Sequence, residues 1–118
     1  MRPNVLIAVI LFLVASGSIP IGSQEASRGN VTASATPESD GGDEKLSVTV
    51  QNDNDYVVAV RVAVQATCTN GSERLPTENK TLEFNYVQAH KSSDRWVDDC
   101  FNGHWNVGSV RIISIKQK

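Results

Sequence analysis

The sequence predicts an all-β protein, a small antiparallel sandwich of two sheets with one disulfide bond. Apolar and polar residues alternate with period two through most of residues 45–118, whereas the helical period is not found there. Two cysteines, Cys68 and Cys100, fall on the apolar phase of this alternation. A small open barrel is the alternative architecture for such a set of strands.

The first predicted strand covers residues 46–51, where leucine and valine alternate with serine, threonine and glutamine. Residues 52–55 are all asparagine or aspartate and predict a turn, because these side chains bond to their own backbone and tolerate positive φ. A long second strand follows from Tyr56 to Cys68. Tyr56, Cys68 and every second residue between them are expected to face the core.

Residues 69–79 are polar and predict a loop. The third strand follows, with Leu82, Phe84 and Tyr86 expected to face inward. Residues 89–95 predict another loop before the fourth strand begins.

The fourth strand carries Trp96 and Cys100 in phase, with Asp98 on the same face. A carboxylate on the core face interrupts the alternation. We therefore expect either a β-bulge at Asp98 or a short strand.

The dipeptide Asn102-Gly103 predicts a hairpin, because a type I′ turn needs positive φ at both central residues. The last strand covers residues 107–115, which are rich in valine and isoleucine. Five strands with short connections form antiparallel sheets whose edge strands are open. A homo-oligomer formed through these edges, or addition of a partner's strand, is expected to be accessible to the fold.

Cys68 and Cys100 are expected to form a disulfide between the two sheets. A loop of about 30 residues closed in this way stabilises a fold by roughly 3–4 kcal/mol, which matters in so small a domain. Free or metal-binding thiols are the alternative.

The first residues predict export. An uninterrupted apolar run at residues 5–15 follows an arginine and suits the h-region of a signal peptide, which we place at residues 1–23. Small residues at Ala15-Ser16-Gly17 offer a cleavage site, and a cut near Ser23 is a second option. An uncleaved N-terminal anchor is the alternative, and both place the rest of the chain at the cell surface or outside the cell.

Residues 24–44 predict a disordered acidic linker of serine, threonine and glycine, with Val31 as the only larger aliphatic residue. A strand centred on Val31 is the alternative. The predicted folded domain is therefore residues 45–118.

One stretch of the sequence resembles the opening hairpin of immunoglobulin-like modules of prokaryotic surface proteins. It consists of residues 46–52, then Tyr56, then the valine-rich run 58–64. The CARDB and FxLYD types are the ones it is similar to. The resemblance covers about 20 residues and implies an extracellular, non-catalytic module. It carries no site residues across.

Charge argues against a nucleic-acid partner. The chain has a net charge of −2, and within residues 45–118 nine basic residues face eight acidic ones. Apart from the last few at the C-terminus, those basic residues are scattered along the sequence, so we expect no contact with a phosphate backbone.

The sequence offers little for catalysis, and we expect no enzyme. His90, Ser92, Ser93 and Asp94 have the composition of a triad, but they are neighbours in one predicted loop. A triad needs groups held across a rigid scaffold, so we interpret them as a solvated loop.

Asp98, Asp99 and His104 fall within seven residues, and carboxylates with an imidazole can hold a divalent ion. Their spacing matches no ligand motif, and charged ends of strands explain them equally well. We therefore expect neither a metal nor a cofactor.

An aromatic cluster surrounds the Asn102-Gly103 turn. Trp96 is expected to pack on the disulfide. The candidate binding surface consists of Phe101, Asn102, His104 and Trp105. Exposed rings beside polar groups suit protein or glycan contacts, although Trp105 covering the open end of the core is the alternative.

Three Asn-x-Ser/Thr sequons, at Asn30, Asn70 and Asn79, are candidate glycosylation sites. Taken together, the sequence favours an exported, non-catalytic binding or structural module with a protein or glycan partner. The alternative is a small secreted inhibitor or toxin-like effector that acts through loop 69–78.

Overall fold

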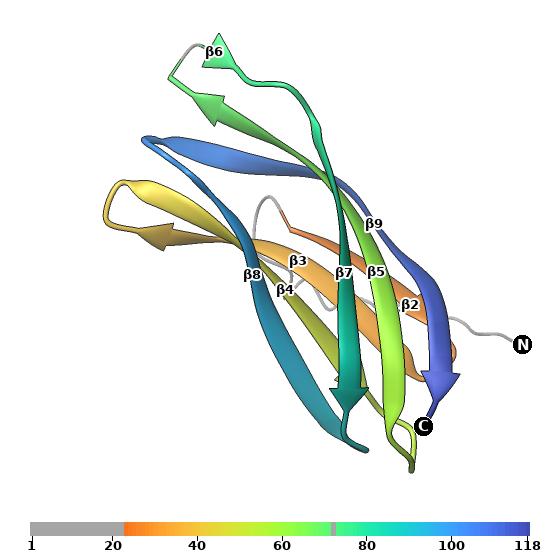
Figure 1. Cartoon of the computed structure of the whole chain (residues 1–118). Helices are drawn as coiled ribbons and strands as arrows, with labels where there is room; N and C mark the ends of the chain where they lie inside the picture. The colour runs from red at the N-terminus through yellow and green to blue at the C-terminus, as the bar shows by residue number, and fades with distance from the viewer. Residues whose placement is uncertain (1–22, 72) are drawn as a thin grey trace, which may run out of the picture.

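The structure is a computed structural model that describes residues 23–71 and 73–118. In these residues the regular elements are strands, and they form two antiparallel sheets packed face to face (Figure 1). The predicted all-β two-sheet sandwich is confirmed. No helix in this part of the chain has the length and apolar character needed to span a membrane. The predicted signal peptide, except for Ser23, lies outside the described residues.

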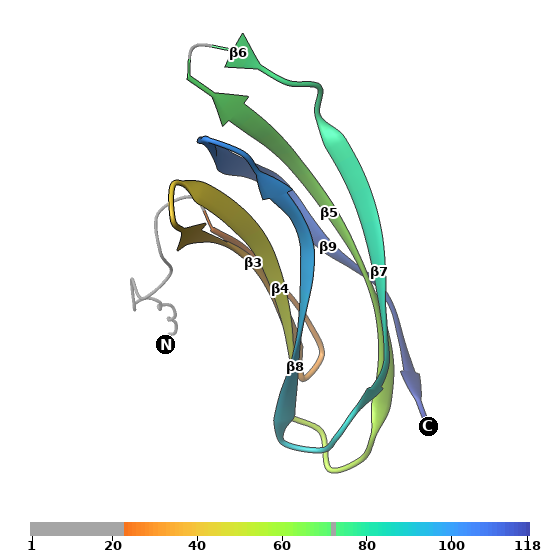
Figure 2. The same ribbon diagram turned by 60° about the vertical axis from the view of Figure 1, so that its left-hand side comes forward.

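The first sheet contains, in spatial order, β2 (Gln24–Arg28), β3 (Val31–Asp40), β4 (Asp43–Asn52) and β8 (Lys91–Cys100). The second sheet contains β5 (Val58–Asn70), β6 (Glu73–Arg74), β7 (Glu78–Val87) and β9 (Gly103–Gln117). Its central strand is β5, which pairs with β7 on one side and β9 on the other, while the short β6 pairs with the end of β5. Figure 2 shows the two layers from the side.

Residues 24–44, predicted to be a disordered linker, instead form β2, β3 and the start of β4. Val31, Ala33 and Ala35 are buried and alternate with serine and threonine. Two of these inward residues are alanines, which give only a weak hydrophobic signal but fit closely between two packed sheets. The linker prediction is therefore wrong. The alternative, a strand centred on Val31, is nearer to the structure, although Val31 begins β3 rather than lying at its centre. The folded domain starts near Gln24 rather than at residue 45.

A tight hairpin joins β3 to β4. Gly41 and Gly42 form its two-residue loop, with φ of 60° and 101°. Positive φ at both central positions is what a type I′ turn requires, and glycine adopts it without strain. The turn fixes the β3–β4 register that places Ala33 opposite Val50 and Ala35 opposite Val48.

The core lies between the sheets, and β5 contributes its inward face from Val58 to Cys68 as predicted. Two tyrosines depart from the prediction. Tyr56 precedes β5 and is exposed, and Tyr86 is 63% exposed. In the β5–β7 ladder, Val58 pairs with Val87 but Val60 pairs with Phe84, so β7 holds one extra residue. This bulge reverses the phase of the strand and brings Val87 into the core in place of Tyr86.

The two predicted loops are shorter than expected. Residues 69–79 include the end of β5, the short β6 and the first residues of β7, and residues 91–95 belong to β8. The polar first residues of β8 form antiparallel pairs with β4: Lys91 pairs with Asn52, and Asp94 pairs with Thr49. Backbone pairing rather than apolar content makes this segment a strand.

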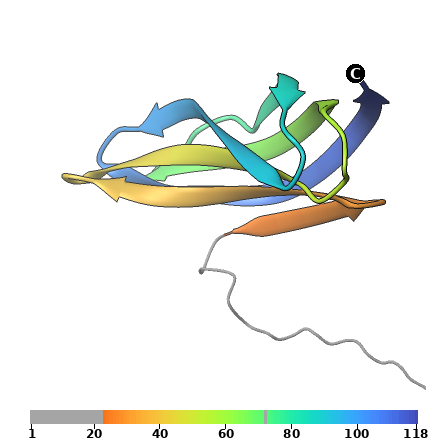
Figure 3. The same cartoon turned by 90° about the horizontal axis from the view of Figure 1, so that it is seen from below.

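Asn52 is a fully buried polar residue at the end where β4 leads into β5 and β7 leads into β8, the end viewed in Figure 3. Its side-chain nitrogen donates to the carbonyl oxygens of Tyr56 at 2.8 Å, Val87 at 3.0 Å and Gln88 at 3.2 Å. Its side-chain oxygen accepts from the backbone N–H of Asn54 at 3.0 Å. One side chain thus ties together the two connections that cross between the sheets at this end of the sandwich.

Cys68 of β5 and Cys100 of β8 form the predicted disulfide, which joins the second sheet to the first. Their Cα atoms are 5.6 Å apart, with 32 positions of sequence separation. The chain-entropy model assigns such a crosslink roughly 3–4 kcal/mol of stabilisation. The disulfide and Asn52 therefore hold opposite ends of the sandwich.

Each long side of the sandwich is bridged by an arginine. Arg28 of β2 donates to the backbone oxygen of Ile113 in β9 at 2.8 Å, and Arg95 of β8 donates to the backbone oxygen of Glu83 in β7 at 2.8 Å. Both edge strands of the second sheet are therefore linked to an edge strand of the first.

Candidate functional site

The predicted binding surface surrounds the turn between β8 and β9, but this turn connects the two sheets. β8 pairs with β4 and β9 pairs with β5, so the chain crosses the sandwich after Cys100. Asn102 has a φ of 53°, whereas Gly103 is not among the residues with positive φ. The prediction of a type I′ hairpin is therefore wrong. The Asn-Gly pair lies instead in the connection that leads from β8 in one sheet to β9 in the other.

Gly103 is required here by close packing. A Cβ atom at this position would lie 2.8 Å from the Cys100 Sγ atom and against the backbone oxygen of Thr69. Real Cβ atoms do not approach so closely, and the backbone of Thr69 is fixed within the β5–β9 ladder. The glycine thus lets β9 start directly against the disulfide.

Two carboxylates at the start of β4 hold this turn. Asp43 accepts the backbone N–H of Asn102 at 2.8 Å, and Glu44 accepts the backbone N–H of Trp105 at 2.8 Å. The second oxygen of Glu44 lies 3.0 Å from the Nδ1 atom of His104. Both acids belong to the segment that the sequence predicted to be a linker, so their role was missed.

The predicted surface is only partly available. Phe101, Asn102 and His104 are exposed, but Trp105 is only 3% exposed and belongs to the core. The indole Nε1 atom of Trp105 is buried without a hydrogen-bond partner in the described part of the chain. The alternative prediction, that Trp105 covers the core, is the one the structure bears out, and its ring is not available to a partner.

Trp96, unlike Trp105, lies at the surface. Its side chain is 66% exposed, although the sequence placed it on the disulfide. The reason is a bulge in β8: Leu46 pairs with Asp98 but Ser47 pairs with Trp96, leaving Val97 as an extra residue. The bulge expected near Asp98 exists, and it puts Cys100 and Trp96 on opposite faces of the strand.

The ring of Trp96 carries a cation on its face. The ammonium of Lys45, on the neighbouring β4, lies 3.6 Å from the ring centroid. This distance is within the range of a cation–π interaction, worth about 0.5–1 kcal/mol at an exposed site. The interaction holds the ring in a defined orientation on the outer face of the first sheet.

Hydroxyl, amide and carboxylate groups surround Trp96 on that outer face. The ladders align these side chains in three rows: Thr36–Ser47–Trp96, Ser34–Thr49–Asp94 and Thr32–Gln51–Ser92. Thr49 donates to Asp94 at 2.8 Å, which fixes two groups of the central row. We name these nine residues, with Lys45, the Trp96 platform. It is a polar sheet face with one exposed aromatic ring, in which Ser47 is buried and the other side chains are at least partly exposed. It is the best candidate site of the described chain.

The residues considered for catalysis do not come together. The Nε2 atom of His90 lies 2.7 Å from Asp55, at the end of the sandwich held by Asn52. Asp94 instead accepts from Thr49. Within the part of the chain that the structure describes, His90 forms no hydrogen bond or ion pair with Ser92, Ser93 or Asp94.

Residues 23–71 and 73–118 contain no group of three or more histidine, cysteine or acidic side chains arranged to hold a metal ion. Of the metal-ligand types noted in the sequence, His104 contacts Glu44, and Asp98 accepts the backbone N–H of Asp99 at 2.8 Å. The three side chains do not form one cluster.

The three sequon asparagines lie at different places. Asn30 is in the β2–β3 turn and donates to Asn54 at 3.3 Å. Asn70 ends β5 and donates to the backbone oxygen of Phe101 at 2.9 Å. Asn79 is exposed on β7 and accepts from Gln65 at 3.3 Å. A glycan on Asn70 would replace a contact that ties β5 to the β8–β9 turn.

No family model, curated protein sequence or solved structure matches this chain. The case for a function therefore depends on the sequence and on the geometry of the sandwich.

Proposed function

We propose that this chain is an exported, non-catalytic binding module whose contact surface is the Trp96 platform. The single observation that carries the proposal is the exposed ring of Trp96 on a sheet face, oriented by Lys45. Burying such a ring would strengthen the core, and here the bulge in β8 turns it outward instead. A ring kept at the surface favours contact with a partner.

The chemistry of the platform indicates the kind of partner. An aromatic face packs against flat apolar surfaces, such as the C–H face of a sugar ring, while the surrounding hydroxyl, amide and carboxylate groups exchange hydrogen bonds with polyols. A glycan, or a protein surface with similar groups, is therefore the expected ligand.

Two features support export. The apolar run at residues 5–15 has the length of a signal-peptide h-region, and the Cys68–Cys100 disulfide is of the kind that persists in oxidising compartments. The resemblance of residues 46–64 to surface modules is consistent with this location. We expect the secreted or surface-bound form to act as a monomeric binder or as one unit of a structural layer.

The test is a binding screen with the oxidised domain, residues 24–118, against neutral polysaccharides and extracellular proteins. Isothermal titration calorimetry measures the affinity of every variant, and in the parent a change in tryptophan emission reports a ligand stacked on Trp96. Trp96→Ala is expected to weaken binding by roughly tenfold or more, the scale of an aromatic hot spot. Tyr86→Ala is the matched control, since Tyr86 is equally exposed but belongs to the second sheet.

Equal affinity of the parent and the Trp96→Ala variant would remove the platform from the proposal. A ligand lost with Tyr86→Ala and retained with Trp96→Ala would move the surface to the second sheet.

A second candidate function, a secreted inhibitor, is favoured by one observation. Leu75 is exposed at the projecting β6–β7 connection, and its backbone N–H donates to the Cys68 oxygen at 3.1 Å, beside the disulfide. A loop held in one conformation loses little entropy when it enters an enzyme cleft. A panel of secreted proteases and glycosidases tests this function: inhibition lost with Leu75→Ala supports it, and full activity of the panel rejects it.

A further inference from the structure

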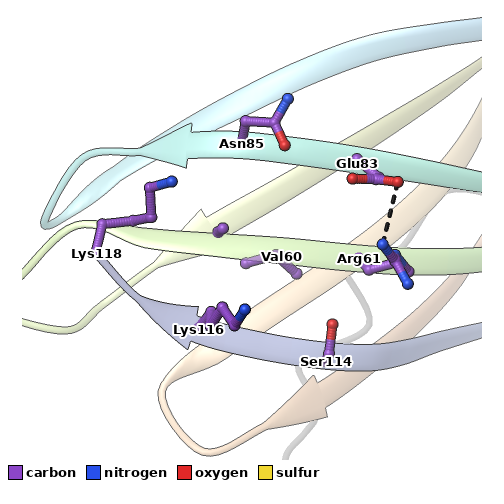
Figure 4. A pocket seen from close by; sticks show the side chains of 8 residues that line it. Val60, Arg61, Glu83, Asn85, Ser114, Lys116 and Lys118 are labelled. Atoms are coloured by element: carbon purple, nitrogen blue, oxygen red, sulfur yellow. Dashed lines mark hydrogen bonds and ion pairs between the residues drawn. The ribbon is translucent and has the colours of Figure 1, made fainter.

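The outer face of the second sheet, opposite the Trp96 platform, is hollowed along β5. Two depressions follow one another there, of about 330 Å³ and about 260 Å³. Their floor contains Ala59 and Ala63 of the central strand, and Arg61 of the same strand rises between them with its side chain paired to Glu83. Longer side chains of β7 and β9 flank the first depression, which Figure 4 shows. We name this pair of depressions the β5 groove. The two alanines leave one depression on either side of Arg61.

Positive charge is concentrated in the groove. Its cationic lining residues are Arg61, Lys80, Arg111, Lys116 and Lys118. The only carboxylate among the described lining residues belongs to Glu83. Five cations and one anion give this face a net charge of +4 in a chain whose net charge is −2, so the remaining residues together carry −6. The groove is thus a positive surface on an acidic protein.

Two of these cations are already paired. Arg61 lies 3.2 Å from Glu83, and Lys80 lies 3.3 Å from Glu78. The other three, Arg111, Lys116 and Lys118, form no ion pair with any residue that the structure describes. All three come from β9 and the residue after it, so the uncompensated charge follows one wall of the groove.

Between the cations lie neutral polar groups. Ser114 and Asn85 line the first depression, and Ser109, Thr81 and Asn79 line the second. No described lining residue is aromatic, so the groove lacks the ring on which a nucleic-acid base would stack. Among the described residues that line the groove, Ile113 has the only exposed large apolar side chain. One such side chain gives too little apolar surface to anchor a peptide.

We propose that the β5 groove binds a linear acidic polysaccharide, whose chain lies along β5 with its carboxylate or sulfate groups against the β9 wall. Hydroxyl and amide side chains match the ligand's hydroxyls, and Arg111 and Lys116 pair with its anions. Ala59 and Ala63 are four residues apart, roughly 13 Å along a strand, so the groove accommodates several units of a polymer. This site is separate from the Trp96 platform and does not depend on it.

The test measures binding of the oxidised domain to polygalacturonate, which carries carboxylates, and to dextran sulfate, with neutral dextran as a blank. The Arg111→Gln/Lys116→Gln variant is compared with Lys91→Gln/Arg74→Gln, which makes the same change in net charge away from the groove. We expect the groove variant to bind roughly tenfold more weakly and the control variant to keep the parent affinity. Preference for one polymer identifies carboxylate or sulfate as the recognised group.

Three outcomes would overturn the proposal. Unchanged affinity of the groove variant removes the groove as the site. An equal loss in both variants shows attraction to overall charge alone. Binding of single-stranded DNA or polyglutamate as tight as that of the acidic polysaccharides removes the ligand class. Circular dichroism and the thermal midpoint check that each variant is folded, and Trp96→Ala, expected to keep full polymer binding, separates this site from the platform.

Discussion

The guanidinium of Arg28 donates a hydrogen bond to the backbone oxygen of Ile113 at 2.8 Å, and a longer one to Ile112 at 3.4 Å. Ile113 is the extra residue of a bulge in β9, because Arg61 pairs with Ser114 while Val62 pairs with Ile112. An unpaired edge strand offers carbonyl groups to any other strand. At this position a charged side chain of the same molecule already uses those carbonyls.

Arg95 has the same relation to β7, where it donates to the Glu83 oxygen at 2.8 Å. We expect the Arg28→Ala/Arg95→Ala variant to self-associate more strongly than the parent, because both edges lose their blocking donor. Sedimentation velocity over a range of concentrations measures this. Arg74→Ala, an exposed arginine on β6, is the control; if the double variant stays as monomeric as Arg74→Ala, the two arginines do not guard the edges.

Asn52 is expected to be the most sensitive polar position of the fold. Asn52→Ala leaves the carbonyls of Tyr56 and Val87 without their buried donor, which costs about 2–4 kcal/mol of unfolding free energy. Urea denaturation of the oxidised domain measures it. Asn106→Ala, which loses one exposed bond to Thr69, is expected to change stability by about 0.5 kcal/mol or less. Similar losses in the two variants would contradict the role given to Asn52.

Gly103→Ala is expected to destabilise the protein by about 1–3 kcal/mol, because the new methyl group overlaps the disulfide and the backbone of Thr69. Gly108→Ala is the matched control on the same strand, since its nearest neighbour would be the Gln65 side-chain oxygen at 3.5 Å. Thermal unfolding distinguishes them. If both alanine variants melt together, Gly103 is not held by packing.

The two tryptophans should differ in spectroscopy and in stability. Trp105→Ala removes a buried ring and is expected to cost about 3–5 kcal/mol. Trp96→Ala removes an exposed ring and its contact with Lys45, at a cost of about 1 kcal/mol or less. Acrylamide quenching adds a second measure: emission from Trp96 should be accessible in Trp105→Phe, and emission from Trp105 should be protected in Trp96→Phe. The reverse pattern would show that the placement of both rings is wrong.

Period-two alternation predicted the elements whose inward residues are large. The inward faces of β4 and β5, the disulfide and the two-sheet class all follow from valines, leucine and cysteines on one phase. The same pattern missed β3, because the inward residues Ala33 and Ala35 are scarcely more apolar than their neighbours. Alternation measures hydrophobic contrast, and small residues in a narrow core have little of it.

Bulges account for two of the misplaced aromatics. A single extra residue in β7 turned Tyr86 outward, and another in β8 did the same to Trp96. A period-two pattern does not indicate where one strand of a pair contains an extra residue. The one signal was Asp98, an acidic residue on a predicted core face, which indicated a bulge in β8. The β5 groove was missed for a different reason: Ala63 and Arg111 are far apart in sequence and lie side by side only through the β5–β9 register.

The disulfide also sets how far the molecule can be stretched. Cys68 and Cys100 enclose a loop that contains β6, β7 and most of β8, whereas β2, β3, β4, most of β5 and all of β9 lie outside it. A pull on the two ends can unravel only the strands outside the loop. The cysteines are 32 positions apart in the sequence, and the disulfide keeps the pull from extending the segment between them, which withholds roughly 110 Å of chain at full extension. Under tension the oxidised protein therefore reaches a shorter maximum end-to-end length than the reduced protein, in which the segment between the cysteines can also extend.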